Sequence, residues 1–386
     1  MLHKLAVVLL LVGLALSASA VTDPAQGKPT EEITAMQLEQ RLVTIQGKPD
    51  ADAALMLSRL ELTERLSTAR LARFNAALPG DKSRQALMLV ADSAAFLDLP
   101  EADVPPDPVP DSAALRGMMV QVVSYVNTTL RQLPNLIAVR ETSRFEDRPQ
   151  EDVLGSTGIT TVFYQPLHYV GRGSVQITYR DHREVQNDGV WKPVSEQSPM
   201  RGLVTAGEFG PFLSTVVADA IHGKITWSHW EQSTGLKQAV FHYVVAKQSS
   251  HYSVQFTSDL IPGSNAGEPS ESQVIGERAA YHGEISFNPA SGAILRITIV
   301  ADMQPPDVIT RSDMMVEYGP VEIGDRSYIC PLKSVSVLQN HRPRSASQLN
   351  PNGSLKTYLN DVTFAHYRRF GSEVNILGEG GKTAAP

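Results

Sequence analysis

Apolar and polar residues alternate from Tyr281 to Met303, on either side of the turn-rich stretch Asn288–Gly292. Alternation with a period of two is typical of strands with one buried face, and a five-residue interruption is typical of a hairpin loop. In the first run Ile285 and Phe287 share a face. In the second run the apolar positions expected on one face are Leu295, Ile297 and Ile299. We therefore expect a hairpin with one apolar face, which must be covered or must hold something apolar.

Runs of the same kind follow one another from about 224 to 370, and strand-like runs also occupy much of 135–205. One short helix is expected between them, within "GEFGPFLSTVVADAIHGK", ending at Gly223. Its expected buried positions are Phe212, Val216, Val217 and Ala220. The pattern indicates a large sheet of consecutive, mainly antiparallel strands.

The spacing changes to a helical one before residue 134. Asp81 follows Pro79-Gly80 and is expected to cap a helix, while Glu61 and Arg65 are spaced for an i,i+4 ion pair on another helix. Asp111 is expected to cap a further helix after the Pro-rich stretch 101–110. The wide apolar stripe of that helix comprises Leu115, Met118, Met119, Val122, Val123, Val126, Leu130 and Leu133. A stripe this wide must pack on something large, such as a sheet.

Helices followed by a long series of strands predict an α+β fold, with a curved, mainly antiparallel β-sheet that helices cover on one face and a helical N-terminal region before it. The expected divisions are a signal peptide at 1–20, a helical region with a Pro-rich linker at 21–110, a helix-plus-sheet domain at 111–370 and a flexible tail at 371–386. No period of 20 to 50 residues repeats, which disfavours propellers and solenoids.

The N-terminus predicts export. Lys4 precedes an apolar stretch from Leu5 to Leu16, and Ala18-Ser19-Ala20 has the small-residue pattern of a cleavage site. Cleavage after Ala20 would deliver the chain to the periplasm or the exterior, without an integral membrane span. The formal net charge is −7, whereas general nucleic-acid binding needs a positively charged surface. No nucleic-acid partner is therefore expected. Cys330 is the single cysteine and is expected to be a buried, unreactive side chain.

Common catalytic patterns are missing from the sequence: it has no G-x-S-x-G, H-E-x-x-H, Walker A or C-x-x-C motif. The histidines near strands lack the i, i+2 spacing of metal ligands, so no metal and no cofactor are expected. These histidines are His222, His229, His242, His251 and His282. A hydrolase would need a cluster in one cleft, drawn from Glu208, His222, His229 and Glu231. No catalytic residue is assigned.

Aromatic residues crowd three successive strands, and two interpretations stay open: core packing, or the lining of a cavity for an apolar ligand. The candidate cavity residues are Trp227, Trp230, Phe241, Tyr243, Phe256, Phe287, Leu295, Ile297 and Met315.

The segments "GEFGPFLSTVVADAIHGKITWSHWE", "YHGEISFNPASGAILRIT" and "MMVEYGPVEIGDRSYICPLKSVSV" resemble blocks of a family of uncharacterised exported bacterial proteins. More loosely, the layout is similar to the LolA/RseB-like half-barrels. That resemblance implies an incomplete antiparallel barrel lidded by helices, with a cavity that binds acyl chains or lipoproteins. The long helical region before residue 100 departs from that pattern.

Two functions are therefore expected ahead of a hydrolase. The first is a non-enzymatic periplasmic carrier or sensor that binds a lipid, a lipoprotein or another apolar ligand. The second is a cell-envelope interaction module that uses the helical N-terminal region to dock a protein partner. Length and composition fit either, because a fold does not by itself set a function.

Overall fold

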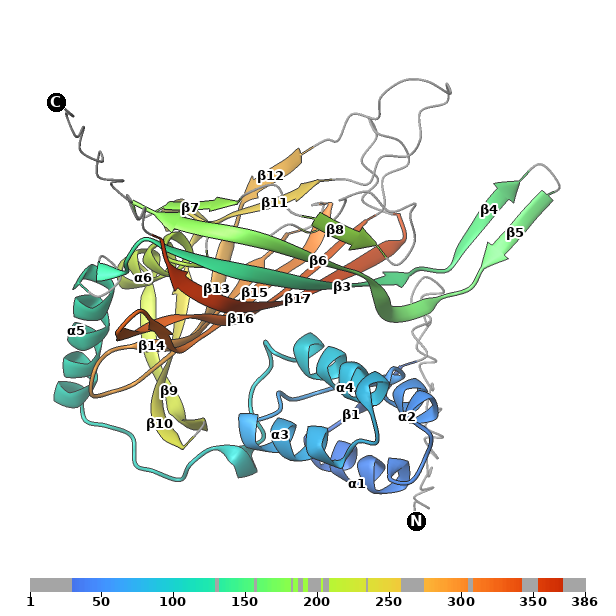
Figure 1. Cartoon of the computed structure of the whole chain (residues 1–386), viewed down its shortest axis with the longest axis horizontal. Helices are drawn as coiled ribbons and strands as arrows, with labels where there is room; N and C mark the ends of the chain where they lie inside the picture. Colours follow the sequence, from blue (N-terminus) through green and yellow to red (C-terminus); the bar gives the residue numbers. More distant parts are fainter. Residues whose placement is uncertain are drawn as a thin grey trace, which may run out of the picture.

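The computed structural model describes most of the chain from residue 30 to residue 370 (Figure 1). The expected signal peptide and C-terminal tail lie outside the described residues. The described ranges are 30–128, 132–155, 158–181, 183–186, 190–193, 203, 208–233, 235–257, 274–304, 308–341 and 353–370.

An open sheet of 11 strands forms the body of the molecule, and every strand pair described in it is antiparallel. The strand order is β7-β6-β3-β17-β16-β15-β14-β13-β10-β9, with β8 also paired to β6. The expected α+β fold with a curved half-barrel sheet is confirmed. The bounds are β3 Leu136–Arg148, β6 Gln165–Arg180, β7 Arg183–Gln186, β8 Val190–Pro193, β9 Lys224–Ser233, β10 Leu236–Val245, β13 Ala280–Phe287, β14 Ile294–Asp302, β15 Ile309–Ile323, β16 Arg326–His341 and β17 Leu355–Arg369.

Smaller elements extend from this body. Two hairpins pair β4 (Glu151–Gly155) with β5 (Gly158–Val162) and β11 (Ser253–Thr257) with β12 (Val274–Arg278). Both project beyond the main sheet in Figure 1.

The helical unit, residues 30–103, has a small core of its own. Leu38, Phe74 and Leu87 are among its buried side chains. Its elements are β1 Glu31–Ile33, α1 Ala35–Ile45, α2 Asp50–Leu57, β2 Leu60–Leu62, α3 Thr68–Ala77, α4 Asp81–Ser93 and the 3₁₀ turn η1 Glu101–Asp103. β1 and β2 pair in parallel, and Thr34 caps α1 with a reciprocal capping box that includes Gln37.

Two expectations within this unit are wrong. Asp81 is the first residue of α4 and its side chain is exposed; the carboxylate that caps α4 comes from Asp50 of α2. Asp50 accepts from the main-chain nitrogens of Lys82 and Ser83 and from the Ser83 hydroxyl, and these bonds lower its pKa. Glu61 lies in strand β2 rather than in a helix, so it does not pair with Arg65 at helical spacing.

The two helices expected beside the sheet are confirmed as α5, Ser112–Thr128, and α6, Pro211–His222. The Asp111 carboxylate caps α5 by accepting from the main-chain nitrogens of Ala113 and Ala114, at 2.9 and 2.8 Å. Of the expected stripe on α5, Leu130 lies outside the described residues. Leu133 lies beyond the helix, which ends at Thr128, so the expected extension of the helix to Leu133 is wrong, although this side chain is buried.

Helices cover both faces of the sheet, whereas the sequence pattern predicted cover on one face. We call the face toward α5 and α6 the inner face, and the face toward the helical unit the outer face. On the outer face Leu89 and Ala95 of the helical unit pack on strand residues. Those strand residues are Phe145, Met315, Val335, Val337 and Leu359, which lie opposite one another in the register. The sheet is therefore the middle of three layers.

The β13–β14 hairpin has a defined structural role. Gly292 in its loop has a φ of +70° and lies against the backbone of α5. A Cβ at this position would be 2.3 Å from the carbonyl oxygen of Gln121, so only glycine fits without moving the helix. The hairpin loop thus holds α5 at the edge of the inner face.

Candidate functional site

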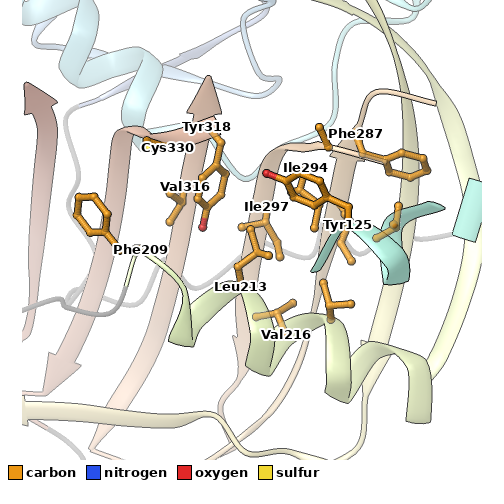
Figure 2. Packing of buried hydrophobic residues seen from close by; sticks show 14 of the residues in the cluster. Tyr125, Phe209, Leu213, Val216, Phe287, Ile294, Ile297, Val316, Tyr318 and Cys330 are labelled. Carbon is orange, nitrogen blue, oxygen red and sulfur yellow. The ribbon is translucent and has the colours of Figure 1, made fainter. Parts of the chain in front are cut away.

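The inner face of the sheet is a broad apolar floor. Its largest fully buried side chains include Tyr243, Tyr281 and Phe287, and the two helices add Leu213 of α6 and Val122 of α5. Figure 2 shows Leu213 and Val216 pointing from α6 toward the strands. Further floor residues are Ile285, Ile294, Ile297, Ile299, Met314, Val316, Val362 and Phe364. So much apolar surface on one face is stable in water only when other segments of the chain or a ligand cover it.

The cover formed by α6 is fixed by a buried carboxylate. Asp219 is 2 % exposed and accepts from the main-chain nitrogen of His251 and the Tyr281 hydroxyl, both at 2.8 Å. Its second oxygen lies 2.6 Å from Nδ1 of His251. Burial and the bond to Asp219 raise the pKa of Tyr281. These bonds tie α6 to β13 and to the segment after β10.

The cover formed by α5 is held more loosely. Only Val122 and Tyr125 of this helix are buried, although its apolar stripe is wide. Leu115, Met118, Met119, Val123 and Val126 are half-buried. Methionine side chains adapt readily to different neighbours. The helix therefore presents an apolar, adaptable side that the described neighbours cover incompletely.

Six of the predicted cavity residues do come together on the inner face: Trp227, Trp230, Phe241, Tyr243, Phe287 and Ile297. The ring of Trp227 meets Trp230 and Phe241 edge to face, with centroids 4.9 and 5.6 Å apart, and Phe241 stacks on Phe287. The Trp230 indole donates to the carbonyl of Pro108 at 3.0 Å, so the Pro-rich linker crosses this end. In the structure these side chains contact one another, as core residues do.

The other three predicted residues do not join this group. Met315 is on the outer face and packs under the helical unit. A bulge between Ser286 and Phe287 pairs Phe287 with Ile294, which takes the inward position expected for Leu295. Leu295 is half-buried and has no partner in the register. The extra residue of the bulge is the physical reason that strict alternation failed here. Phe256 lies in β11, and its side chain is outside the described residues.

A band of polar residues crosses the inner face beyond the apolar floor. We call Thr142, Ser334, Ser336 and Asn360 the polar band; their exposed fractions are 8, 0, 2 and 4 %. Ser334 lies opposite Val316 and Val362 in the register, and Ser336 lies opposite Met314 and Asn360. Directly opposed residues point to the same side of a sheet, so the band shares its face with the floor. Sequence reasoning missed this band.

A buried ion pair flanks the polar band. Glu208 is 0 % exposed, and its Oε1 accepts from Nη2 of Arg140 at 3.2 Å. The Tyr318 hydroxyl donates to the main-chain oxygen of Glu208 at 3.2 Å. Burial, reinforced by the Glu208 charge, raises the pKa of Tyr318 well above its usual value. The segment at Glu208 and Phe209 is thereby fixed over β3 and β15.

Of the four residues of a hypothetical hydrolase cluster, only His229 and Glu231 lie near each other. Glu208 is on the inner face, whereas Glu231 pairs with Arg65 of the helical unit at 3.0 Å. Nε2 of His229 is 3.9 Å from Glu231, and His222 bonds the Ala218 carbonyl at the exposed end of α6. Across the described ranges, no group of three or more His, Cys, Asp or Glu side chains is arranged to hold a metal ion.

No protein-family model matches the chain, and no curated protein matches it. Among solved structures, a DUF1329 family protein from Desulfovibrio piger is 10 % identical, over 70 % of this chain and 95 % of its own, with a TM-score of 0.26. A putative outer membrane lipoprotein-sorting protein domain from Vibrio parahaemolyticus is 10 % identical over 68 and 96 %, with a TM-score of 0.29. MucB in the Pseudomonas aeruginosa MucA/MucB complex is 9 % identical over 68 and 100 %, with a TM-score of 0.19.

All three structures have TM-scores below 0.5 and identities of 9 or 10 %. At such TM-scores they add nothing to the fold that the strand pairing already defines. Among the residues that the structure describes, no helix has both the length and the hydropathy needed to cross a membrane.

Proposed function

We propose that the chain is an exported binding protein that holds an apolar chain, such as the acyl chain of a lipid or lipoprotein, between α5 and the inner face. The protein needs no catalytic group for this role. The observation that carries the proposal is the unequal cover of the inner face: α6 is fixed through Asp219, whereas α5 leaves its apolar stripe half-buried.

The physical basis is the difference between the rigid apolar floor and its loosely held cover, α5. The floor is apolar and built from many strands, so it stays rigid when the lid moves. α5 is held by few fully buried side chains, and elements with few buried contacts open at low free-energy cost. An acyl chain entering beneath α5 would bury the half-exposed stripe together with its own methylene groups, each contributing about 0.8 kcal/mol.

The first test is native mass spectrometry of the mature chain, Val21 to Pro386, purified from a periplasm and then extracted with organic solvent. A lipid released only on denaturation would support the proposal and identify the ligand class.

The companion test is displacement of a fluorescent fatty acid. Met119→Lys places a charge on the half-buried stripe and should weaken binding at least about tenfold. Val120→Lys, on the exposed side of α5 (65 % exposed), is the matched control and should bind as the wild type does. Failure of the wild type to bind any acyl probe would refute the proposal.

A second candidate, an envelope interaction module, is favoured by the solvent side of the helical unit. Met36, Val43 and Leu55 are 65, 67 and 56 % exposed there. A shallow groove of about 220 Å³ lies beside Leu55. Its lining also includes Ile45, Met56 and Leu60 and the charged residues Glu31, Arg41 and Arg59. Leu55→Glu should abolish capture of an envelope partner without changing acyl-probe binding, whereas unchanged capture would remove this candidate. Deleting the whole unit is a poor test, because it would strip the cover from the outer face.

A further inference from the structure

Two serine hydroxyls on the inner face are buried without a hydrogen-bond partner. Oγ of Ser334 and Oγ of Ser336 have none in the described structure, and the two residues are 0 and 2 % exposed. Neither is needed to satisfy a neighbour, and alanine would fill almost the same volume. Leaving a buried hydroxyl unpaired destabilises a fold, so native structures contain few such groups. Two of them at alternate positions of one strand mark a place where a polar partner is expected.

Their position is specific. One row of the sheet holds Val316, Ser334, Val362 and Thr142, and the next holds Met314, Ser336, Asn360 and Arg144. The apolar floor lies on one side of these rows. On the other side Leu338 and Tyr358 belong to a second apolar cluster on the same face, which also contains Ala301 and Ile309. The polar band therefore interrupts an apolar surface, as the binding site for an amphiphile with a polar head would.

The charges beside the band indicate the kind of head. Arg140 is paired with Oε1 of Glu208, so these two formal charges compensate one another. Arg144, in the second row, adds a positive charge, and its Nη2 donates to the main-chain oxygen of Leu203 at 3.4 Å. The second carboxylate oxygen of Glu208, Oε2, is buried and has no hydrogen-bond partner in the described structure. It can only accept, so the missing partner must be a donor. Tyr318 and Arg140 hold Glu208. Each lies two residues along its strand from a member of the row that contains Ser334: Tyr318 from Val316, and Arg140 from Thr142.

From this arrangement we infer that the polar band is a headgroup site that selects an uncharged, hydroxyl-bearing amphiphile of the monoacylglycerol type. The inference rests on the proposed function, since it assigns the head of a ligand whose chain lies on the apolar floor. Hydroxyl groups of the head donate to Oε2 of Glu208 and exchange hydrogen bonds with Ser334 and Ser336. A free carboxylate head has no proton to donate to Oε2 of Glu208 and is disfavoured for that reason, although Arg144 lies in the second row.

The test compares three probes with the same 18-carbon chain: 1-monooleoylglycerol, methyl oleate and oleate. Each competes with a fluorescent fatty acid on the wild type, on Ser334→Ala/Ser336→Ala and on the control Ser327→Ala. Ser327 is an exposed serine of the same strand, β16. The double variant should lose about tenfold in affinity for 1-monooleoylglycerol, the loss expected for about two hydrogen bonds, and should bind methyl oleate unchanged. The control should match the wild type for all three probes.

The melting temperature of the ligand-free double variant distinguishes a ligand-binding role of the two serines from a purely structural one. Removing two unpaired hydroxyls should leave the melting temperature of the ligand-free double variant unchanged or raised. A lowered melting temperature would mean that the serines serve the fold and would overturn the inference. Equal affinity of the double variant and the wild type for 1-monooleoylglycerol would also overturn it, as would tightest binding of oleate. Failure of all three probes on the wild type would instead refute the proposed function itself.

Discussion

Arg65 and Glu231, 166 residues apart in sequence, form a buried two-point ion pair with both nitrogen–oxygen distances at 3.0 Å. Arg65 belongs to the helical unit and Glu231 to β9, so the pair joins the first layer of the molecule to the sheet. Burial acts to raise the pKa of Glu231, but the Arg65 guanidinium holds this pKa below its usual range. Arg296 of β14 adds a bond to the main-chain oxygen of Ala95. The helical unit is thus docked on the outer face by buried charges as well as by apolar contacts.

Arg65→Met should destabilise the protein by about 3–5 kcal/mol, because it leaves the Glu231 carboxylate buried without its partner. Urea unfolding monitored by tryptophan fluorescence measures this. Arg41→Met, which removes the exposed pair with Glu31, should cost at most about 1 kcal/mol. The double variant Arg65→Met/Glu231→Gln should recover part of the loss. Equal effects at Arg65 and Arg41 would contradict the docking role.

Gly292→Ala should move α5, whereas Gly324→Ala should not. Both glycines have a φ of +70° in hairpin loops, so each substitution carries a similar backbone strain of about 1 kcal/mol. A Cβ at Gly324 meets nothing within 4 Å, but one at Gly292 strikes the backbone of Gln121. Hydrogen exchange of the α5 amides should accelerate in Gly292→Ala alone. Equal exchange in the two variants would show that the hairpin loop does not hold the helix.

Cys330 should report whether the inner face opens. The thiol is 0 % exposed within the apolar floor, and burial raises its pKa to about 12, so it is neutral at pH 8. The native protein should therefore react with a thiol reagent far more slowly than the urea-unfolded chain. Gly292→Ala should react faster than Gly324→Ala if α5 is the moving cover. Rapid labelling of the native wild type would show that the Cys330 thiol is not enclosed within the apolar floor.

Stability should fall as the pH rises from about 4 to about 7, with Asp92 as one cause. Burial, together with the nearby charge of Asp361, raises the pKa of Asp92 to about 7, and the Lys333 ammonium at 2.6 Å opposes this only in part. Between pH 4 and pH 7 the folded state therefore keeps a proton on Asp92 that the unfolded state has released. The stability gained from this protonated Asp92 is fully present below the unfolded pKa of 3.8 and is lost as the pH rises through about 7.

Urea unfolding at several pH values between 4 and 8 measures this dependence. Asp92→Asn cannot titrate and should show a flatter profile across that window than the wild type. Asp81→Asn, whose side chain is fully exposed on the same helix, should keep the wild-type profile. An identical slope for Asp92→Asn and the wild type would remove Asp92 as the cause.

The sequence by itself determined the local elements. The period-two pattern located the β13–β14 hairpin, the helical stripe located α5, and the Asp111 cap formed as expected. The burial of Cys330 followed in the same way from an apolar, β-type run. Each of these depends on residues within a few positions of one another, so the chain's own periodicity and capping chemistry are sufficient to specify them.

Only the tertiary structure decided which residues distant in sequence pair with one another. Asp50 replaced Asp81 as the cap of α4, and Glu231 rather than Glu61 became the partner of Arg65. One bulge moved Leu295 away from the inward position, because each added residue reverses the side to which a strand residue points. The polar band depends on the register of β3, β15, β16 and β17 together. Register between strands distant in sequence is set by packing of the whole sheet, which no local pattern records.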